Sequence, residues 1–159
     1  MSKSEEKTNA MRLIDKAGVK YEVFNYPADG TLTGVQVAKM IGVEEKTAYK
    51  TLVTKGKSGE HYVFDIPVDY ELDLKKAAKA VGEKFVEMIK AKDLLPVTGY
   101  IHGGCSPVGM KKAFRTVFDA SAEGLEYICF SGGRLGVFLR LKAADAFKIV
   151  QPLFADVTL

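Results

Sequence analysis

The order of hydrophobic and polar residues changes its period along this chain, and each change predicts a new element. Ala10, Leu13 and Ile14 recur at the spacing of one helix face, and Gly18 follows as a stop. By the same reasoning, helices are predicted over residues 5–17, 33–42, 74–81 and 143–150, and a single helical turn over residues 92–95 that Pro96 breaks.

Two of the predicted helices are bounded by residues with suitable capping chemistry. Thr33 and Gln36 fit the Thr-x-x-Gln capping box, and Asp73 is a favourable N-cap for the helix after it. Gly42 and Gly82 stand where a residue in the left-handed conformation terminates such helices. These boundaries are therefore predicted by chemistry as well as by periodicity.

Strand patterns alternate with these helices. β-branched and aromatic residues gather in short segments, and a hairpin-type loop at residues 55–60 separates two of them. Strands are predicted over residues 21–26, 48–54, 61–66, 84–88, 116–118, 125–130 and 137–141. Interleaved helices favour parallel pairing, whereas hairpin loops favour antiparallel pairing. The sequence therefore predicts a mixed sheet in a single α+β domain over residues 1–159.

Composition excludes more chemistry than it proposes. The chain has 159 residues and two histidines, His61 and His102, with neither HExxH nor GxSxG, so no metal centre and no hydrolase triad are expected. Its two cysteines, Cys105 and Cys129, cannot form a disulfide framework. Cys105, with only His102 nearby as a base, is more typical of a packing residue than of an activated nucleophile. We expect no metal and no cofactor.

Charge and targeting signals give weaker information. The net charge is +3, from 23 basic and 20 acidic residues, so contact with a nucleic acid would require local clustering. The first ten residues lack the apolar run of a signal peptide, and no stretch approaches the roughly 18 apolar residues of a membrane span. The expected location is cytoplasmic, with no membrane partner.

Two glycine-rich loops are the first candidates for a binding site. One covers residues 98–109 and the other residues 131–136. Glycine lets a backbone approach a ligand closely and turn its N–H groups toward an anion or a carbonyl oxygen. The first loop is not a P-loop, because Met110 stands where that motif requires lysine, and the second lacks the spacing of a dinucleotide fingerprint. Tight turns that bind nothing would explain both loops equally well.

Lys50 is the second candidate. Alternation along residues 48–54 places it on the same strand face as Ala48 and Leu52. A lysine there can bind an anion or polarise a carbonyl group, but it can also protect a sheet edge from aggregation or extend its ammonium group to solvent. Periodicity alone leaves these alternatives open.

Three basic residues follow the first glycine loop, namely Lys111, Lys112 and Arg115. Such a cluster can neutralise phosphates of a nucleic acid. It is equally typical of a solvated face, and the chain has no aromatic-interleaved RNA-binding motif.

Four segments of the chain together resemble the YbaK/EbsC family. The longest, residues 98–112, reads TGYIHGGCSPVGMKK and is similar to the family signature TGY…GG-x-SP-x-G-x-KK. Residues 49–52, 72–79 and 131–134 are similar to its YKTL strand, its LDLKK-x-AK helix and its SGG loop. The likeness extends over residues 10–150.

The resemblance implies a mixed, partly closed, barrel-like β-sheet with packed helices. It also implies a trans-editing enzyme that hydrolyses mischarged aminoacyl-tRNA. The branch most similar to this chain removes cysteine from Cys-tRNA(Pro), often in company with prolyl-tRNA synthetase. In that branch the substrate thiol attacks its own carbonyl carbon and releases a cyclic thiolactone. The enzyme then contributes position and electrostatics rather than a nucleophile.

The same resemblance implies roles for particular residues. The family's invariant lysine corresponds to Lys50, which is expected to be catalytic and to hold the terminal adenosine or its phosphate. The ligand-contacting tyrosine corresponds to Tyr26. The loop residues expected to bind the carbonyl oxygen or the terminal ribose are Gly103, Gly104, Ser106, Ser131, Gly132 and Gly133.

One position departs from the family pattern. Phe138 stands where close members carry an acidic residue suited to the α-amino group of the substrate. This departure leaves open a sister specificity, such as deacylation of Ala- or Ser-tRNA by an activated water. An interpretation from another class is a non-catalytic module that binds the tRNA acceptor end or a synthetase.

Overall fold

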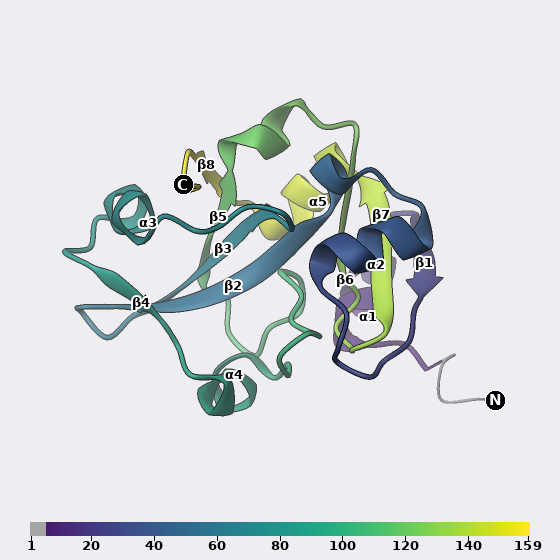
Figure 1. Ribbon diagram of the computed structural model, residues 1–159, viewed down its shortest axis with the longest axis horizontal. Coiled ribbons are helices and arrows are strands. Elements are labelled where there is room, and N and C mark those ends of the chain that lie inside the picture. Colours follow the sequence, from purple (N-terminus) through teal and green to yellow (C-terminus); the bar gives the residue numbers. More distant parts are fainter. Residues whose placement is uncertain (1–5) are drawn as a thin grey trace.

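The computed structural model describes residues 6–159 (Figure 1). The α-helices of this part are α1 (Asn9–Lys16), α2 (Gly34–Ile41), α3 (Leu74–Val81), α4 (Ala91–Thr98) and α5 (Ala143–Val150). Residue 5, where the first helix was predicted to begin, lies outside the described residues, as does half of the N-terminal stretch inspected for a targeting signal. None of the described helices has the length and apolarity needed to cross a membrane.

The capping predictions are confirmed. The Thr33 hydroxyl accepts a hydrogen bond from the Gln36 backbone N–H at 3.2 Å, and the Gln36 side chain accepts one from the Thr33 N–H at 2.8 Å. The Asp73 carboxylate accepts from the first N–H groups of α3. Gly42 and Gly82 end α2 and α3 with φ of 78° and 74°, a region that glycine enters without strain.

The strands form two sheets. Their bounds are β1 (Tyr21–Asn25), β2 (Tyr49–Gly56), β3 (His61–Pro67), β4 (Val86–Met88), β5 (Arg115–Asp119), β6 (Tyr127–Ser131), β7 (Val137–Lys142) and β8 (Leu153–Ala155). One sheet has the order β1-β7-β6 and is antiparallel. The other has the order β4-β2-β3-β5-β8 and is mixed, because β5 runs parallel to both β3 and β8. The predicted α+β class with mixed pairing is confirmed.

The closed geometry implied by the family resemblance is not supported. The two sheets remain separate, and neither closes on itself. In the described part of the chain, the β-bridge between them is a single parallel pair, Ala48 with Cys129. Side chains rather than continuous strand pairing therefore join the sheets.

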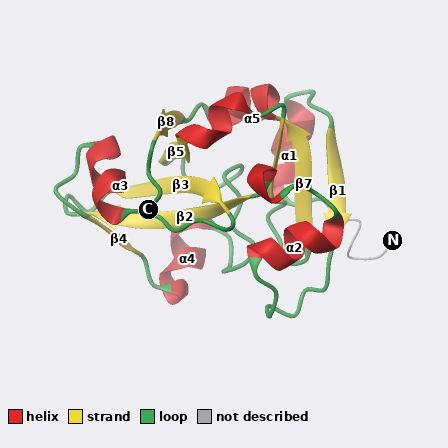
Figure 2. Ribbon diagram, turned by 45° about the horizontal axis from the view of Figure 1, so that its top comes forward, coloured by secondary structure: helices red, strands yellow, loops and turns green. Residues whose placement is uncertain are grey.

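Helices cover both faces of each sheet. In the three-stranded sheet, α1 and α5 pack against one face and α2 against the other. In the five-stranded sheet, α3 packs against one face, and α4 with the segment after it packs against the opposite face. Figure 2 shows α3 and α4 on opposite sides of β2 and β3. Residues of α2, β2 and α4 line the cavity that forms the candidate site.

Two local predictions were wrong. Helix α4 continues through Pro96, whereas only a helical turn ending before it was predicted. Proline removes one hydrogen bond, but the N–H of Gly99 still reaches the Leu95 carbonyl at 2.9 Å, and the buried Leu94 anchors the helix on the core. Strand β8 was not predicted, since its three residues become a strand only by pairing with β5.

Candidate functional site

A cavity of about 550 Å³ lies between the two sheets, and it is lined by segments that are far apart in the sequence. They are the β1–α2 connection, β2, the β4–α4 junction and both glycine-rich loops. Its volume falls in the range of small-molecule sites. A second hollow, of about 970 Å³, lies near Tyr21 and Tyr127 and is lined by none of the candidate site residues named from the sequence.

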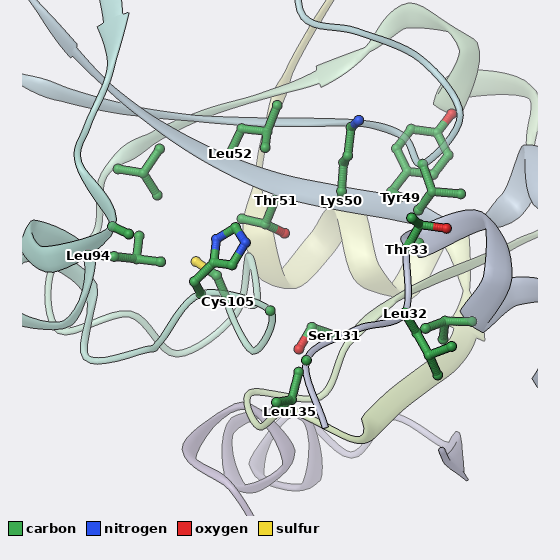
Figure 3. Close-up of a pocket in the computed structure, with 18 of the residues that line it drawn as sticks. Leu32, Thr33, Tyr49, Lys50, Thr51, Leu52, Leu94, Cys105, Ser131 and Leu135 are labelled. Atoms are coloured by element: carbon green, nitrogen blue, oxygen red, sulfur yellow. The ribbon is translucent and has the colours of Figure 1, made fainter. Parts of the chain in front are cut away.

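The edge of β2 forms one wall of the cavity. Strand β4 pairs with β2 only from Thr54 to Gly56, so β4 leaves residues 50–52 of β2 uncovered. Successive side chains of a strand point to opposite sides. Figure 3 shows this alternation, with Lys50 and Leu52 extending to one side of β2 and Thr51 to the other, where Cys105 lies.

Lys50 lines this cavity together with Tyr26, the two residues to which the family resemblance assigns contact with the ligand. Among residues 6–159 no carboxylate lies within salt-bridge distance of the Lys50 ammonium group. Its side chain is half-buried. A half-buried cation without a protein counter-ion is suited to an anionic or strongly polar ligand.

The two glycine-rich loops touch each other, so they form one unit. A Cβ on Gly104 would lie 2.9 Å from the backbone nitrogen of Leu135, and one on Gly103 would lie 2.8 Å from the Leu135 side chain. Gly103 and Ser131 line the cavity, as does Leu135. The two loops, which touch each other at Leu135, therefore both contribute to the cavity wall.

The remaining predicted loop residues lie behind the cavity wall. Gly104 is packed as just described, and the Ser106 hydroxyl is fully buried and accepts from the Val108 N–H at 3.2 Å. A Cβ on Gly132 would lie 2.6 Å from the Val137 side chain, and the Gly133 N–H donates to Ser131. The structure thus brings Lys50, Tyr26, Gly103 and Ser131 together and places the other four in the support of the loops.

The three basic residues after the first glycine loop, Lys111, Lys112 and Arg115, are exposed. They do not line the cavity. The Lys111 N–H donates to the Thr98 carbonyl at 2.9 Å, which fixes the start of this basic segment at the end of α4. The cluster is a surface feature, separate from the ligand space.

The Cys105 side chain lines the cavity but is poorly suited to nucleophilic attack. Burial raises the pKa of the thiol to about 12. Because the pKa is raised, the thiol keeps its proton at neutral pH, and the thiolate is the reactive form. Cys129 is fully buried, and burial raises its pKa as well.

Phe138 makes the cavity wall beside Ser131 apolar. The two residues are direct partners in the β6–β7 pair, and both face the cavity. The Phe138 ring packs edge-to-face with Tyr26 at a centroid distance of 6.4 Å. The acidic residue expected at this position would meet Tyr26 and the apolar residues of α2.

Sequence reasoning missed several residues of the cavity. Thr51 follows Lys50, and His102 and Leu135 belong to the two glycine loops. The sequence analysis identified these three segments as candidates but did not name these three side chains as part of the site. Leu32 and Leu94 come from elements with no local signal of a site. Among residues 6–159 no group of three or more His, Cys, Asp or Glu is arranged to hold a metal ion.

We expect Gly104→Ala to destabilise the fold by about 1–3 kcal/mol, because the new Cβ would press on backbone atoms of the other loop. Urea unfolding followed by circular dichroism measures the change. The matched control is Gly124→Ala, where nothing lies within 4 Å of the new Cβ and a change within about 0.5 kcal/mol is expected. Equal losses in the two variants would contradict close packing of the loops.

Comparison with known proteins identifies the family of this chain. The family model described as "Aminoacyl-tRNA editing domain" matches residues 29–149. The Enterococcus faecalis protein that carries the provisional name Cys-tRNA(Pro)/Cys-tRNA(Cys) deacylase EbsC is 41% identical over 157 residues, which cover 98% of this chain and 96% of that protein.

Two more distant proteins are also similar to this chain over most of its length. The multifunctional Ser/Thr-tRNA deacylase ProXp-y of Escherichia coli K12 is 25% identical over 144 residues, covering 88% of this chain and 85% of its own. A crystal structure provisionally described as a trans-editing enzyme for prolyl tRNA synthetase superposes with a TM-score of 0.84 at 24% identity, covering 95% of both chains. At that identity the superposition supports the fold alone. With the family model matched over residues 29–149 and a relative at 41% identity over nearly its full length, the chain belongs to the aminoacyl-tRNA editing domain family.

Proposed function

We propose that this protein is a trans-editing deacylase that removes cysteine from mischarged Cys-tRNA(Pro). The observation that carries the proposal is a cavity in which Lys50 has no counter-ion among residues 6–159, while the Cys105 thiol that lines it stays protonated. Such a site favours a reaction in which the protein orients and polarises an ester without attacking it. The name of the Enterococcus faecalis relative supports the same substrate.

In this mechanism the substrate supplies the nucleophile. The cysteine sulfur forms a bond to its own carbonyl carbon, and the bond from that carbon to the ribose oxygen breaks. The thiol proton ends on the departing ribose oxygen, so the products are a cyclic thiolactone and uncharged tRNA. Lys50 holds the terminal nucleotide, and the loop at Gly103 and Ser131 binds the carbonyl oxygen or the ribose. The rate increases because the enzyme holds the substrate thiol and the ester carbonyl in a geometry in which they can react.

A sister specificity is the second candidate. Phe138 removes the acidic contact expected for the α-amino group, and the Escherichia coli relative is named as a Ser/Thr-tRNA deacylase. A hydroxyl or methyl side chain cannot perform the thiol reaction, so a water activated in the cavity would replace it. The two candidates therefore differ in product, which is a thiolactone in one case and a free amino acid in the other.

A panel of charged tRNAs separates the candidates. We expect release from Cys-tRNA(Pro) to exceed release from Ser- and Ala-charged tRNA(Pro) by about 10²-fold, because only the thiol is an internal nucleophile. The measurement is loss of labelled amino acid, with mass spectrometry of the product. Similar rates for all three would reject the thiol mechanism and favour the sister specificity. Binding without release from any tRNA would favour the non-catalytic acceptor-end module.

The exposed basic cluster and a synthetase partner complete the proposal. Lys111, Lys112 and Arg115 are exposed and lie outside the cavity, and we propose that they contact the phosphates of the acceptor stem. A net charge of +3 is too small to hold a whole tRNA tightly. We infer that prolyl-tRNA synthetase, the enzyme that makes the mischarged product, supplies the remaining affinity.

A further inference from the structure

A buried carboxyl group lies directly beneath the cavity wall. Asp65 of β3 is fully buried and stands opposite Thr51 of β2 in the β2–β3 pair. Its Oδ1 atom accepts a hydrogen bond from the Thr51 hydroxyl at 2.5 Å, whereas its Oδ2 atom has no partner among the described residues. Thr51 lines the cavity, so its hydroxyl connects the ligand space with Asp65.

The position of Asp65 is costly for stability. It interrupts an apolar run on β3, with Val63 and Ile66 buried nearby. Burying a carboxyl group with an unpartnered oxygen costs free energy that an apolar residue would not. Desolvation raises the pKa of Asp65 to about 8, and the Thr51 hydrogen bond lowers it only in part. The group is therefore mostly protonated at pH 7. In the structure its Oδ1 atom is the acceptor of the hydrogen bond from the Thr51 hydroxyl.

This pairing fixes the direction of hydrogen bonding at the cavity wall. A hydroxyl has one proton to donate, and Thr51 directs it to Asp65. The Thr51 oxygen is then left with lone pairs only. A ligand group that contacts it must supply a donor, such as a thiol or a hydroxyl, because a methyl group cannot do so. Figure 3 shows Thr51 on the side of β2 that faces Cys105, with Ser131 lying beyond on the same side.

We propose that Asp65 is a specificity-determining positioning residue, which holds the Thr51 hydroxyl so that its oxygen accepts a hydrogen bond from the thiol or hydroxyl side chain of the bound aminoacyl group. The proposal deepens the proposed function and rests on it, since it identifies the part of the cavity that distinguishes cysteine from alanine. It also gives the cost of burying Asp65 a functional reason. The carboxyl acts on the ligand through Thr51 alone.

The test measures binding, so that it does not depend on turnover. The probes are 3′-cysteinylamino-adenosine and 3′-alanylamino-adenosine, in which an amide replaces the ester and only the thiol differs. Calorimetry under reducing conditions at pH 7 gives the affinity ratio of the two probes. We expect the wild-type protein to prefer the cysteinyl probe, and Thr51→Val to reduce that ratio by about 3–10-fold, the loss expected for one hydrogen bond.

Matched variants separate positioning from folding. Thr51→Ser keeps the hydroxyl and Asp65→Asn keeps an acceptor for it, so both should retain the ratio, whereas Asp65→Val should lose it. The control is Thr54→Val on the same strand, because the Thr54 hydroxyl is buried against the Tyr62 carbonyl and does not line the cavity. Asp65→Val also removes the unpartnered buried carboxyl, so we expect this variant to be at least as stable as the wild type. If it is, a loss of selectivity in this variant cannot be attributed to unfolding.

The outcomes of this test and of the deacylation panel are distinct. An unchanged ratio in Thr51→Val, an equal loss of affinity for both probes, or no binding of either probe by the wild type would overturn the role of Asp65. A Thr51-dependent ratio in a protein that releases no amino acid would reject the proposed function and keep the polar subsite. If the protein releases cysteine and the affinity ratio of the two probes is the same in Thr51→Val as in the wild type, the proposed function is supported and the polar subsite is rejected.

Discussion

Replacing Lys50 with alanine should lower kcat/KM for release of cysteine from Cys-tRNA(Pro) by about 10²–10³-fold, the usual effect of removing a group that stabilises developing charge in a closed site. Lys50 lines the cavity on the uncovered edge of β2, and among the described residues no carboxylate pairs with it. Its charge is thus available to the substrate. Initial rates with labelled Cys-tRNA(Pro) over a range of concentrations measure the effect.

The control for this variant is Lys55→Ala. Lys55 is exposed on the same strand and lies outside the cavity, so its removal changes net charge by the same amount without touching the site. We expect its kcat/KM to stay within about threefold of the wild type, because exposed charges act weakly at a distance. If Lys50→Ala keeps wild-type activity while remaining folded, Lys50 has no part in the reaction.

The largest effect on stability is expected for Phe118→Ala, at about 3–5 kcal/mol. Phe118 of β5 is fully buried between elements that the chain order keeps apart. Its ring stacks on Tyr49 of β2 at 6.3 Å and packs edge-to-face with Phe147 of α5 and Phe154 of β8. The same cluster includes residues of α1 and of the three-stranded sheet. Removing the ring leaves a cavity at the junction of the two sheets.

Urea unfolding of Phe118→Ala measures this loss, and Phe85→Ala is the matched control. Phe85 is 46% exposed, so the same chemical change removes little buried area, and a loss below about 1 kcal/mol is expected. A loss for Phe118→Ala as small as that for Phe85→Ala would mean that the aromatic cluster does not hold the sheets together.

Local chemistry explains the successes of sequence prediction. The capping box at Thr33 and Gln36, the N-cap at Asp73 and the terminating glycines each depend on neighbours within four residues, so the sequence contains the whole interaction. The failures have the opposite character. Pro96 stays inside α4 because distant residues bury one side of that helix, and β8 exists only because β5 lies beside it.

The residues of the candidate site also fall into two groups, those with a local sequence motif and those without one. The glycine loops and Lys50 carry recognisable motifs, whereas Leu32 and Leu94 enter the cavity from elements with no motif. Asp65 had no local signal of function either. A single acidic residue in a strand pattern is ordinarily an exposed position, and its burial depends on the strands on both sides of it.

The sequence by itself determined most of the helices and strands, the capped ends of α2 and α3 and the family to which the chain belongs, because these depend on short-range spacing and on motifs that keep their order. Only the tertiary structure decided that the strands form two sheets, that four of the eight predicted binding residues face one cavity, and that a buried carboxyl lies behind Thr51. These features result from contacts between segments far apart in the chain. Their energies depend on burial and geometry, which no local pattern of residues encodes.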